Sequence, residues 1–195
     1  MPGVDLPNPQ DIETQRRERF TRRVALTTAI YAVSLALASL GGGNVMKDML
    51  LAQQLASNQW AYYQAKVVRE DLARHQKAQL DLTLLEREKS VAPATRQTLE
   101  GARQKASDEA AHFKGQRLKI QTEARKFEAD RDLSQQKDPY FDFAQVALQL
   151  AIILASIAML ASARPVFYVS LIFAAFGALF TLNGFTLLFR IPFFH

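Results

Sequence analysis

"FAQVALQLAIILASIAMLASARPVFYVSLIFAAFGALFTLNGFTLLF", residues 143–189, is the stretch that decides the fold. It contains two long apolar runs, Phe143–Ala163 and Val166–Phe189, and its one charged residue, Arg164, stands between them. A helix needs roughly 20 apolar residues to cross the hydrocarbon core of a bilayer. Both runs are long enough, so we predict transmembrane helices at residues 143–163 and 166–189, joined by a tight turn.

A third apolar run, Val24–Leu40, lies upstream and is extended by three consecutive glycines, Gly41, Gly42 and Gly43. We predict a first transmembrane helix over residues 24–43, with the glycines as a hinge where the chain leaves the membrane. The alternative is a cleavable signal peptide. A basic segment precedes the run, and Ala36-Leu37-Ala38 within it has the small-x-small form of a cleavage site.

Arginines set the predicted orientation. Five of them lie in the basic tail, residues 1–23, and Arg164 lies two spans later, so both clusters face the same side. The positive-inside rule places that side in the cytoplasm. We therefore expect a multi-pass protein of the bacterial inner membrane whose N-terminus is cytoplasmic. The insertion between spans one and two and the C-terminal tail, residues 190–195, would lie outside. The five arginines are Arg16, Arg17, Arg19, Arg22 and Arg23.

The insertion, residues 44–142, is highly charged but nearly neutral, with 17 basic and 15 acidic residues. A nucleic-acid-binding segment needs a patch of one sign, so nucleic acid is not an expected partner. The sequence offers no serine–histidine–acid set, no glycine-rich phosphate loop and no metal-ligand cluster. The chain has no cysteine. We expect no catalytic activity, no metal site and no cofactor.

The insertion is predicted to be a helical hairpin. Residues 44–89 contain no Gly or Pro, and residues 94–137 contain no Pro and two glycines. Ser90-Val91-Ala92-Pro93 between them is a credible turn. Asp138-Pro139 would form an elbow where the second arm ends before span two. The predicted fold is thus an all-α membrane protein of three transmembrane helices, with a long antiparallel coiled-coil hairpin inserted between the first and second.

Each arm carries an apolar stripe that we expect to form the seam between the arms. In the second arm an apolar residue recurs every seven positions, which is a coiled-coil signal. His75, in the weaker stripe of the first arm, is either a pH-sensitive group or a polar residue that fixes the register, and we prefer the second interpretation. The second-arm stripe is Leu99, Ala106, Phe113, Ile120 and Phe127, and the first-arm stripe is Ala61, Ala65, Val68, Leu72, His75, Gln79 and Leu82.

The segment "SNQWAYYQAK", residues 57–66, has two faces on a helix. We expect its small face, Ser57, Ala61 and Ala65, to pack on the second arm. The opposite face would then be a subunit or partner interface, because Tyr and Trp are enriched in such contacts. A membrane-interface belt, a site for a polar or anionic ligand and packing around the second arm are alternatives. That face comprises Gln59, Trp60, Tyr62, Tyr63 and Lys66.

The segment "RRVALTTAIYAVSLALASLGGGNVMKDMLLAQQLASNQWAYYQAK", residues 22–66, resembles the start of an uncharacterised bacterial membrane family, a domain of unknown function (forty-three thirty-seven). The Gln-Trp-Ala-Tyr-Tyr-Gln-Ala-Lys block is the specific part of the resemblance. "FAQVALQLAIILASIAML", residues 143–160, is similar to the second span of that family. The resemblance implies three spans with an inserted helical region and brings no known activity.

Uncharged polar residues lie within the predicted spans: Gln145, Gln149 and Ser156 in the second, and Asn183 in the third. They either line a pore or hydrogen-bond between closely packed helices. Acidic and basic residues are absent from the interior of the spans, and these would be the usual mark of ion or proton transport. We therefore prefer packing.

These features predict a homo-oligomeric integral membrane protein whose hairpin acts as a scaffold, tether or sensor in the cell envelope. The aromatic face and the small-residue faces of the spans both need cover, which favours self-association in the lipid bilayer. A further envelope protein is a possible partner. The alternative function is an oligomeric channel or pore lined by polar residues of spans two and three.

Overall fold

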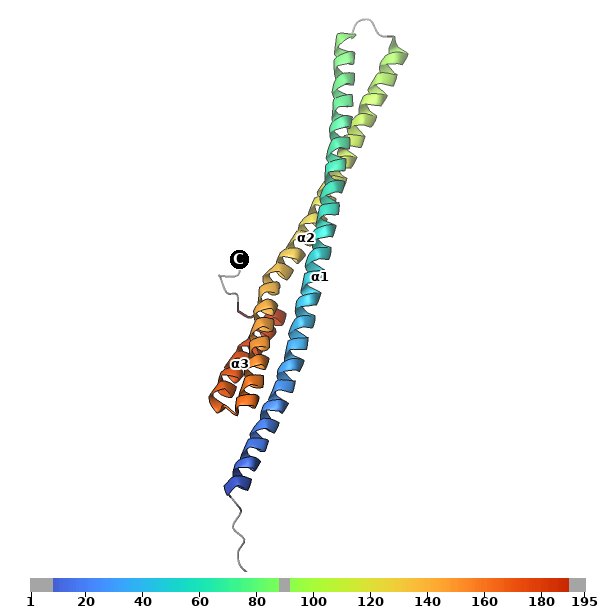
Figure 1. Cartoon of the computed structure of the whole chain (residues 1–195). Coiled ribbons are helices and arrows are strands. Elements are labelled where there is room, and N and C mark those ends of the chain that lie inside the picture. The colour runs from blue at the N-terminus through green and yellow to red at the C-terminus, as the bar shows by residue number, and fades with distance from the viewer. Residues whose placement is uncertain (1–8, 88–91, 190–195) are drawn as a thin grey trace, which may run out of the picture. The chain divides into compact units, whose positions relative to one another are not determined.

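The computed structural model describes residues 9–87 and 92–189, and its regular structure there is entirely helical. Along the chain the helices are α1 (Pro9–Glu86), α2 (Pro93–Ala161) and α3 (Arg164–Thr186) (Figure 1). The predicted all-α class is therefore confirmed. Residues 1–8, Ser90 and Val91 of the predicted turn at Ser90–Pro93, and the predicted tail 190–195 lie outside the described residues.

Two predicted interruptions are absent. Helix α1 continues through Gly41, Gly42 and Gly43, and no described glycine has a positive φ, so the expected hinge is ordinary helix. Helix α2 continues through Pro139 instead of ending in an elbow. Glycine and proline both weaken a helix interior. Here tertiary burial outweighs that cost, because Tyr140 and Phe141 directly after the proline are buried.

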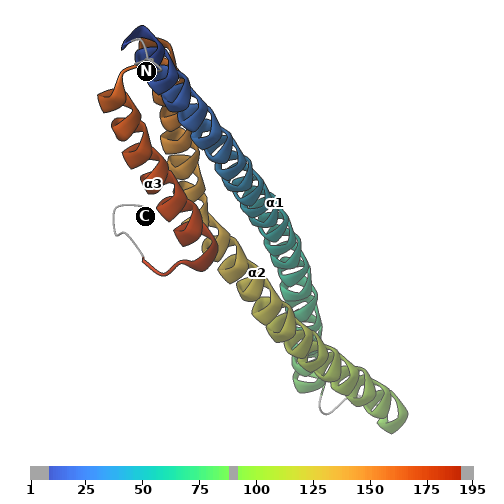
Figure 2. The same ribbon diagram turned by 90° about the horizontal axis from the view of Figure 1, so that it is seen from below.

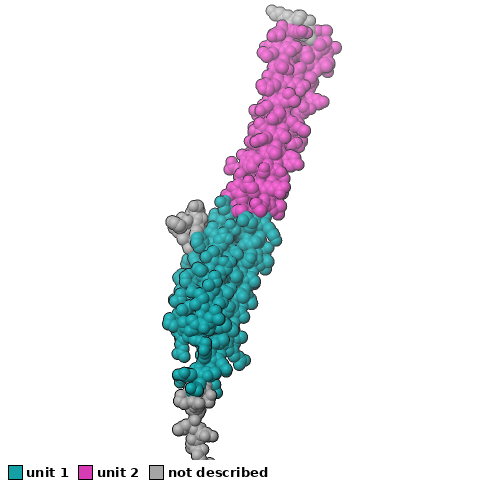
Figure 3. All heavy atoms as spheres, in the orientation of Figure 1, with its two compact units in different colours: residues 1–48, 133–195 teal, residues 49–132 magenta. Residues whose placement is uncertain are grey.

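The chain divides into two compact units (Figure 3). Unit 1 comprises residues 1–48 and 133–195, and unit 2 comprises residues 49–132. Unit 1 contains the first part of α1, the last part of α2 and all of α3. Unit 2 contains the rest of α1 and the start of α2, and so corresponds to most of the predicted hairpin.

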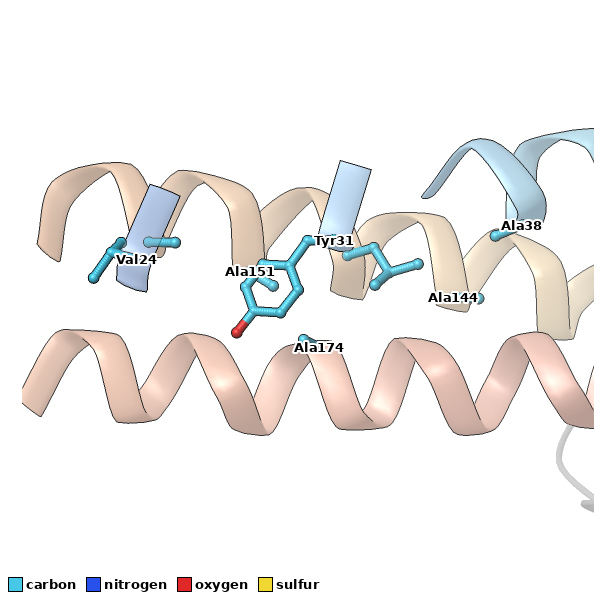
Figure 4. Close-up of a cluster of buried hydrophobic side chains, with 8 residues drawn as sticks. Val24, Tyr31, Ala38, Ala144, Ala151 and Ala174 are labelled. Atoms are coloured by element: carbon cyan, nitrogen blue, oxygen red, sulfur yellow. The ribbon is translucent and has the colours of Figure 1, made fainter. Parts of the chain in front are cut away.

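The core of unit 1 is built from small residues at helical spacing. Val24, Tyr31 and Ala38 of α1 are buried at intervals of seven residues and pack against alanines of α2 and α3 (Figure 4). The three helices of the unit lie side by side (Figure 2). Small side chains allow helix backbones to approach closely. The residues contributed by the other two helices are Ala144, Leu148, Ala151, Ala155 and Ala174.

Phe141 occupies a socket made by glycines from two other helices. Its side chain is 0% exposed. A Cβ atom added to Gly42 of α1 would lie 3.1 Å from the Cβ of Phe141, and one added to Gly184 of α3 would lie 2.9 Å from its ring. A Cβ on Gly41 would collide with the same ring. The Phe185 ring meets Phe141 edge to face at 4.9 Å, so these contacts join the three helices at one point.

Each helix includes a stretch that is long and apolar enough to cross a membrane, by length and composition. Large apolar side chains of unit 1 point outward: Leu37, Ile153, Leu160 and Leu179 are among the exposed ones. Small inner residues and large outer ones are the distribution expected of helices that meet lipid tails.

The arms of unit 2 run antiparallel. Arg131 Nη1 donates a hydrogen bond of 3.0 Å to Gln53 Oε1. Further along the first arm, Asp81 forms an ion pair of 3.5 Å with Arg103. Gln53 pairs with Arg131, and Asp81 pairs with Arg103, so residue numbers rise along α1 as those of the partners fall along α2. The two arms are therefore antiparallel.

The first prediction concerns the glycine socket. Phe141→Ala should lower the free energy of unfolding by about 3–5 kcal/mol, because it leaves a cavity that three helices line. Denaturant unfolding of the detergent-held protein, followed by circular dichroism, measures the loss. Phe176→Ala is the control, because that ring is 54% exposed and should change stability by less than about 1 kcal/mol. Equal effects of the two substitutions would contradict the socket.

The second prediction concerns Asp138, which precedes the apolar run of α2. Burial raises the pKa of its carboxyl above the ordinary value, and the negative charge of Asp142 raises it further. The folded state thus binds this proton more tightly than the unfolded state. The resulting stabilisation is full below the ordinary pKa of the carboxyl and declines as pH rises through the raised pKa.

Asp138→Asn should therefore be more stable than the wild type at pH 7, and this difference should shrink towards acid pH. Denaturation midpoints measured at several pH values between 4 and 7 test this. A stability difference that stays constant over that range would exclude Asp138 as the cause.

Candidate functional site

The aromatic block of α1 contacts α2 within the hairpin. The Trp60 indole Nε1–H donates a hydrogen bond of 2.8 Å to Glu128 Oε1. The Trp60 ring meets the Tyr63 ring edge to face at 5.3 Å. The Arg117 guanidinium lies over the Tyr63 ring at 5.6 Å, and Lys66 Nζ lies 5.5 Å from the centroid of Phe113. Cation–π contacts of this kind favour a fixed pairing of the arms.

The two faces of this segment are reversed relative to the sequence prediction. Ser57, Ala61 and Ala65, which we expected against the second arm, are exposed. The opposite face turns to the second arm, with its members Gln59, Trp60, Tyr63 and Lys66 partly buried. The rings and amphipathic chains bury more area than the small face would, which explains the reversal. Tyr62 stays outside, and the interface prediction is left with this one exposed aromatic residue.

Glu70 is the buried charge of the seam. The residue is 1% exposed. One carboxylate oxygen lies 2.5 Å from Arg74 Nη2, one turn along α1, and the other lies 3.3 Å from Arg117 Nε on α2. Neither approach has hydrogen-bond geometry, so the attraction is one of charge. Arg117 thus serves two partners on α1, Glu70 and Tyr63.

The seam of the first arm is not the predicted stripe. The seven residues expected there are all exposed, His75 and Gln79 included. The positions that face α2 instead follow a mixed stripe in which every seventh residue is Ala56, Tyr63, Glu70, Lys77 and Leu84. A search for apolar residues misses this stripe because it includes a tyrosine, a glutamate and a lysine. The exposed residues are Ala61, Ala65, Val68, Leu72, His75, Gln79 and Leu82.

In the second arm the predicted stripe faces α1. Ala106 is buried, as is Ala124, and the larger members are partly buried. Those larger members are Leu99, Phe113, Ile120 and Phe127. Sequence reasoning did not single out Glu70, Arg117 or Glu128. The available signal was the seven-residue spacing that Glu70 shares with Ala56 and Tyr63.

The polar residues of the predicted spans differ in their contacts within the described structure. Asn183 closes the end of α3: its Nδ2–H₂ donates to the Phe189 carbonyl at 2.7 Å, and the Phe189 N–H donates to its Oδ1 at 2.9 Å. Ser156 donates to the Ile152 carbonyl of its own helix. Gln145 is partly buried beside Gly42, and Gln149 is exposed. Gln145 thus makes a packing contact, and Asn183 caps its own helix.

The side chains of the seam make contacts that hold the two arms together. Within residues 9–87 and 92–189, no three His, Asp or Glu side chains come close enough together to hold a metal ion. His112 hydrogen-bonds with Gln116 at 2.9 Å on the surface of α2. What the seam offers is a directional set of hydrogen-bond, ion-pair and cation–π contacts, which can fix the register of two helices.

Glu70 gives a third prediction. Glu70→Ala should destabilise the hairpin by about 3–5 kcal/mol, because it leaves the half-buried Arg117 guanidinium without its carboxylate. Glu70→Met together with Arg117→Met should be close to wild type, since an apolar pair of similar volume replaces two desolvated charges. Thermal unfolding measures both variants, and Glu109→Ala, at an exposed position, is the control. A double variant as unstable as Glu70→Ala would contradict this account.

No curated protein and no solved structure matches the chain. A family sequence model described as "Domain of unknown function (DUF4337)" matches residues 20–187. The match covers most of the chain and includes the Trp60 block, the hairpin and all of α3. The chain therefore belongs to the DUF4337 family, a domain of unknown function.

Proposed function

We propose that this chain is an integral membrane protein that anchors a helical hairpin at the bilayer and self-associates through the outer face of the hairpin's first arm. Its role would be to scaffold, tether or sense in the cell envelope, without catalysis. The placement proposed here is the bacterial inner membrane, with the N-terminus cytoplasmic and the hairpin outside.

One observation carries the proposal: α1 has a second, largely apolar stripe at heptad spacing, interrupted by His75 and Gln79, that no described residue covers. Val68 is 67% exposed and Leu72 is 68% exposed. Ala65 precedes them and Leu82 follows them in the same heptad pattern, and both are exposed. The stripe is two residues out of phase with the seam, so it lies about 200° around the helix from α2. A helix with apolar stripes on opposite faces can bind two partners.

A second copy of the chain fits this stripe. Copies held in one bilayer by the same helices are related by rotation about the membrane normal, so their first arms run parallel. In a parallel pair the residues that flank the stripe meet across the interface. Gln64 would meet Arg69 of the other copy, and Asp71 would meet Gln76, so no like charges oppose. All four side chains are exposed.

The apolar composition of the helices supports the membrane anchor. Each helix includes a stretch sufficient to cross a bilayer, and exposed Leu and Phe side chains surround the small-residue core of unit 1. Tyr62, at the flank of the exposed stripe, adds an aromatic side chain of the kind enriched in protein interfaces.

The fourth prediction tests self-association. Native mass spectrometry of the detergent-held wild type should give one discrete oligomer, and Val68→Gln/Leu72→Gln should shift it to monomer. Leu118→Gln, on α2, is the control: this leucine is 50% exposed and lies outside the stripe. The substitutions are on the surface, so helix content by circular dichroism should not change. A monomeric wild type, or an oligomer that survives the double substitution, would overturn the proposal.

A further inference from the structure

We propose that unit 1 binds the phosphate of an anionic phospholipid in an arginine-lined cavity at the end of the bundle where α3 begins. The cavity has a volume of about 450 Å³. The inference rests on the membrane placement proposed above, and it is independent of self-association. The lining residues are Arg16, Arg19, Phe20, Arg23, Arg164, Phe167 and Tyr168.

Helix α1 presents three of the arginines on one face. Arg16, Arg19 and Arg23 are three and four residues apart, so they fall within an arc of about 60° on a helix. Two further arginines, Arg17 and Arg22, point away from the cavity and line a different groove beside Glu18. The same helix therefore offers both the arginines of the site and a matched pair outside it.

The turn between α2 and α3 supplies the fourth guanidinium. Arg164 is the first residue of α3, and the preceding Ala163 makes no side-chain cap. Pro165 follows, so the start of this helix is left with few backbone donors. The positive end of the helix dipole still adds to the arginine charge. Residues far apart in the sequence, at the start of α1 and the start of α3, thus converge on one cavity.

Aromatic rings form the apolar part of the cavity. Phe20 and Phe167 meet edge to face at 5.8 Å, and Tyr168 lies beside Phe167 at 6.2 Å. Phe20 and Phe167 are partly buried. This contact holds α1 against α3 and places an apolar surface next to the guanidinium groups. A phospholipid needs both features, since its phosphate is joined through glycerol to apolar acyl chains.

Among the described residues, the positive charge of the cavity has no counterion. None of the residues that line it in the described structure is acidic, and no described carboxylate forms an ion pair with these arginines. Like charges around one space repel each other, and a bound anion relieves this repulsion. Guanidinium groups match the geometry of phosphate oxygens in paired hydrogen bonds. A phosphate is therefore the anion best suited to balance these arginines.

The level of the cavity along the helices selects the lipid as the source of the phosphate. Arg23 immediately precedes the apolar run that begins at Val24, and Arg164 separates the two apolar runs of α2 and α3. Both arginines thus stand where apolar helix ends, which is the depth of lipid headgroups when the helices span a bilayer. Basic pockets between such helices are suited to anionic headgroups.

Native mass spectrometry in mild detergent tests the site with phosphatidylglycerol and phosphatidylcholine of identical acyl chains. The wild type should retain phosphatidylglycerol in preference. Arg19→Gln/Arg164→Gln should weaken its binding at least about tenfold, since about 1.4 kcal/mol corresponds to that factor and charge-assisted bonds exceed it. Arg17→Gln/Arg22→Gln removes the same charge outside the cavity and should bind like the wild type. Arg19→Lys/Arg164→Lys keeps the charge and should bind with intermediate affinity.

Several outcomes would overturn the site. If Arg17→Gln/Arg22→Gln weakened phosphatidylglycerol binding as much as Arg19→Gln/Arg164→Gln, the lipid would be held by the general positive charge of the protein and not by this cavity. Stabilisation of the wild type by inorganic phosphate, measured by thermal shift and lost in Arg19→Gln/Arg164→Gln, without any preference for phosphatidylglycerol, would overturn the assignment to a lipid. An unchanged oligomer mass in all variants separates this site from the proposed self-association, which depends on Val68 and Leu72.

Discussion

The packing of unit 1 depends on the contact of one phenylalanine with glycines. Phe141 of α2 fits against Gly41 and Gly42 of α1 and Gly184 of α3, and any side chain at these glycines meets its ring. For helices that span a bilayer, as proposed for this unit, the hydrophobic effect would not drive association, so close van der Waals contact would have to do so. The alanine-rich stripes of the three helices continue this close approach along the unit. The glycines therefore contribute the space that the bundle needs, and α1 remains helical where a hinge was expected.

Unit 2 uses the opposite principle. Its arms meet through Glu70, Arg117, Trp60 and Glu128, whose hydrogen-bond and charge contacts are directional. A buried charge contributes little net stability, because its desolvation offsets the attraction. It does penalise every register in which the charge lacks its partner. A long helix pair with alanines along its seam has few other features that distinguish one register from the next, so this penalty sets the alignment.

Much of this architecture could be predicted from the sequence. The apolar runs located the membrane-compatible stretches of all three helices, and the absence of proline from the arms predicted long helices. The stripe from Leu99 to Phe127 faces α1 because it is apolar and strictly periodic. The first-arm seam was missed, because its repeat mixes alanine, tyrosine, glutamate and lysine, whereas the more apolar stripe lies outside. Hydropathy ranks the faces of a helix by their apolar content, whereas these two arms pair through specific hydrogen-bond and charge contacts. Hydropathy alone therefore selects the wrong face. The hydrogen bonds between Asn183 and Phe189 could not be predicted either, because they depend on how the chain turns after α3.

The mixed seam has a consequence for how the hairpin behaves when it opens. Separated arms would present Glu70, Lys66 and Lys77 to their surroundings along the faces that had been joined. Transiently exposed hydrocarbon is what drives partly folded chains into aggregates. The first arm would thus keep charge on its opened face, whereas the second arm would expose the apolar side chains of Leu99, Phe113, Ile120 and Phe127. The closed hairpin therefore protects the second arm from aggregation, and the risk of opening lies on one arm alone.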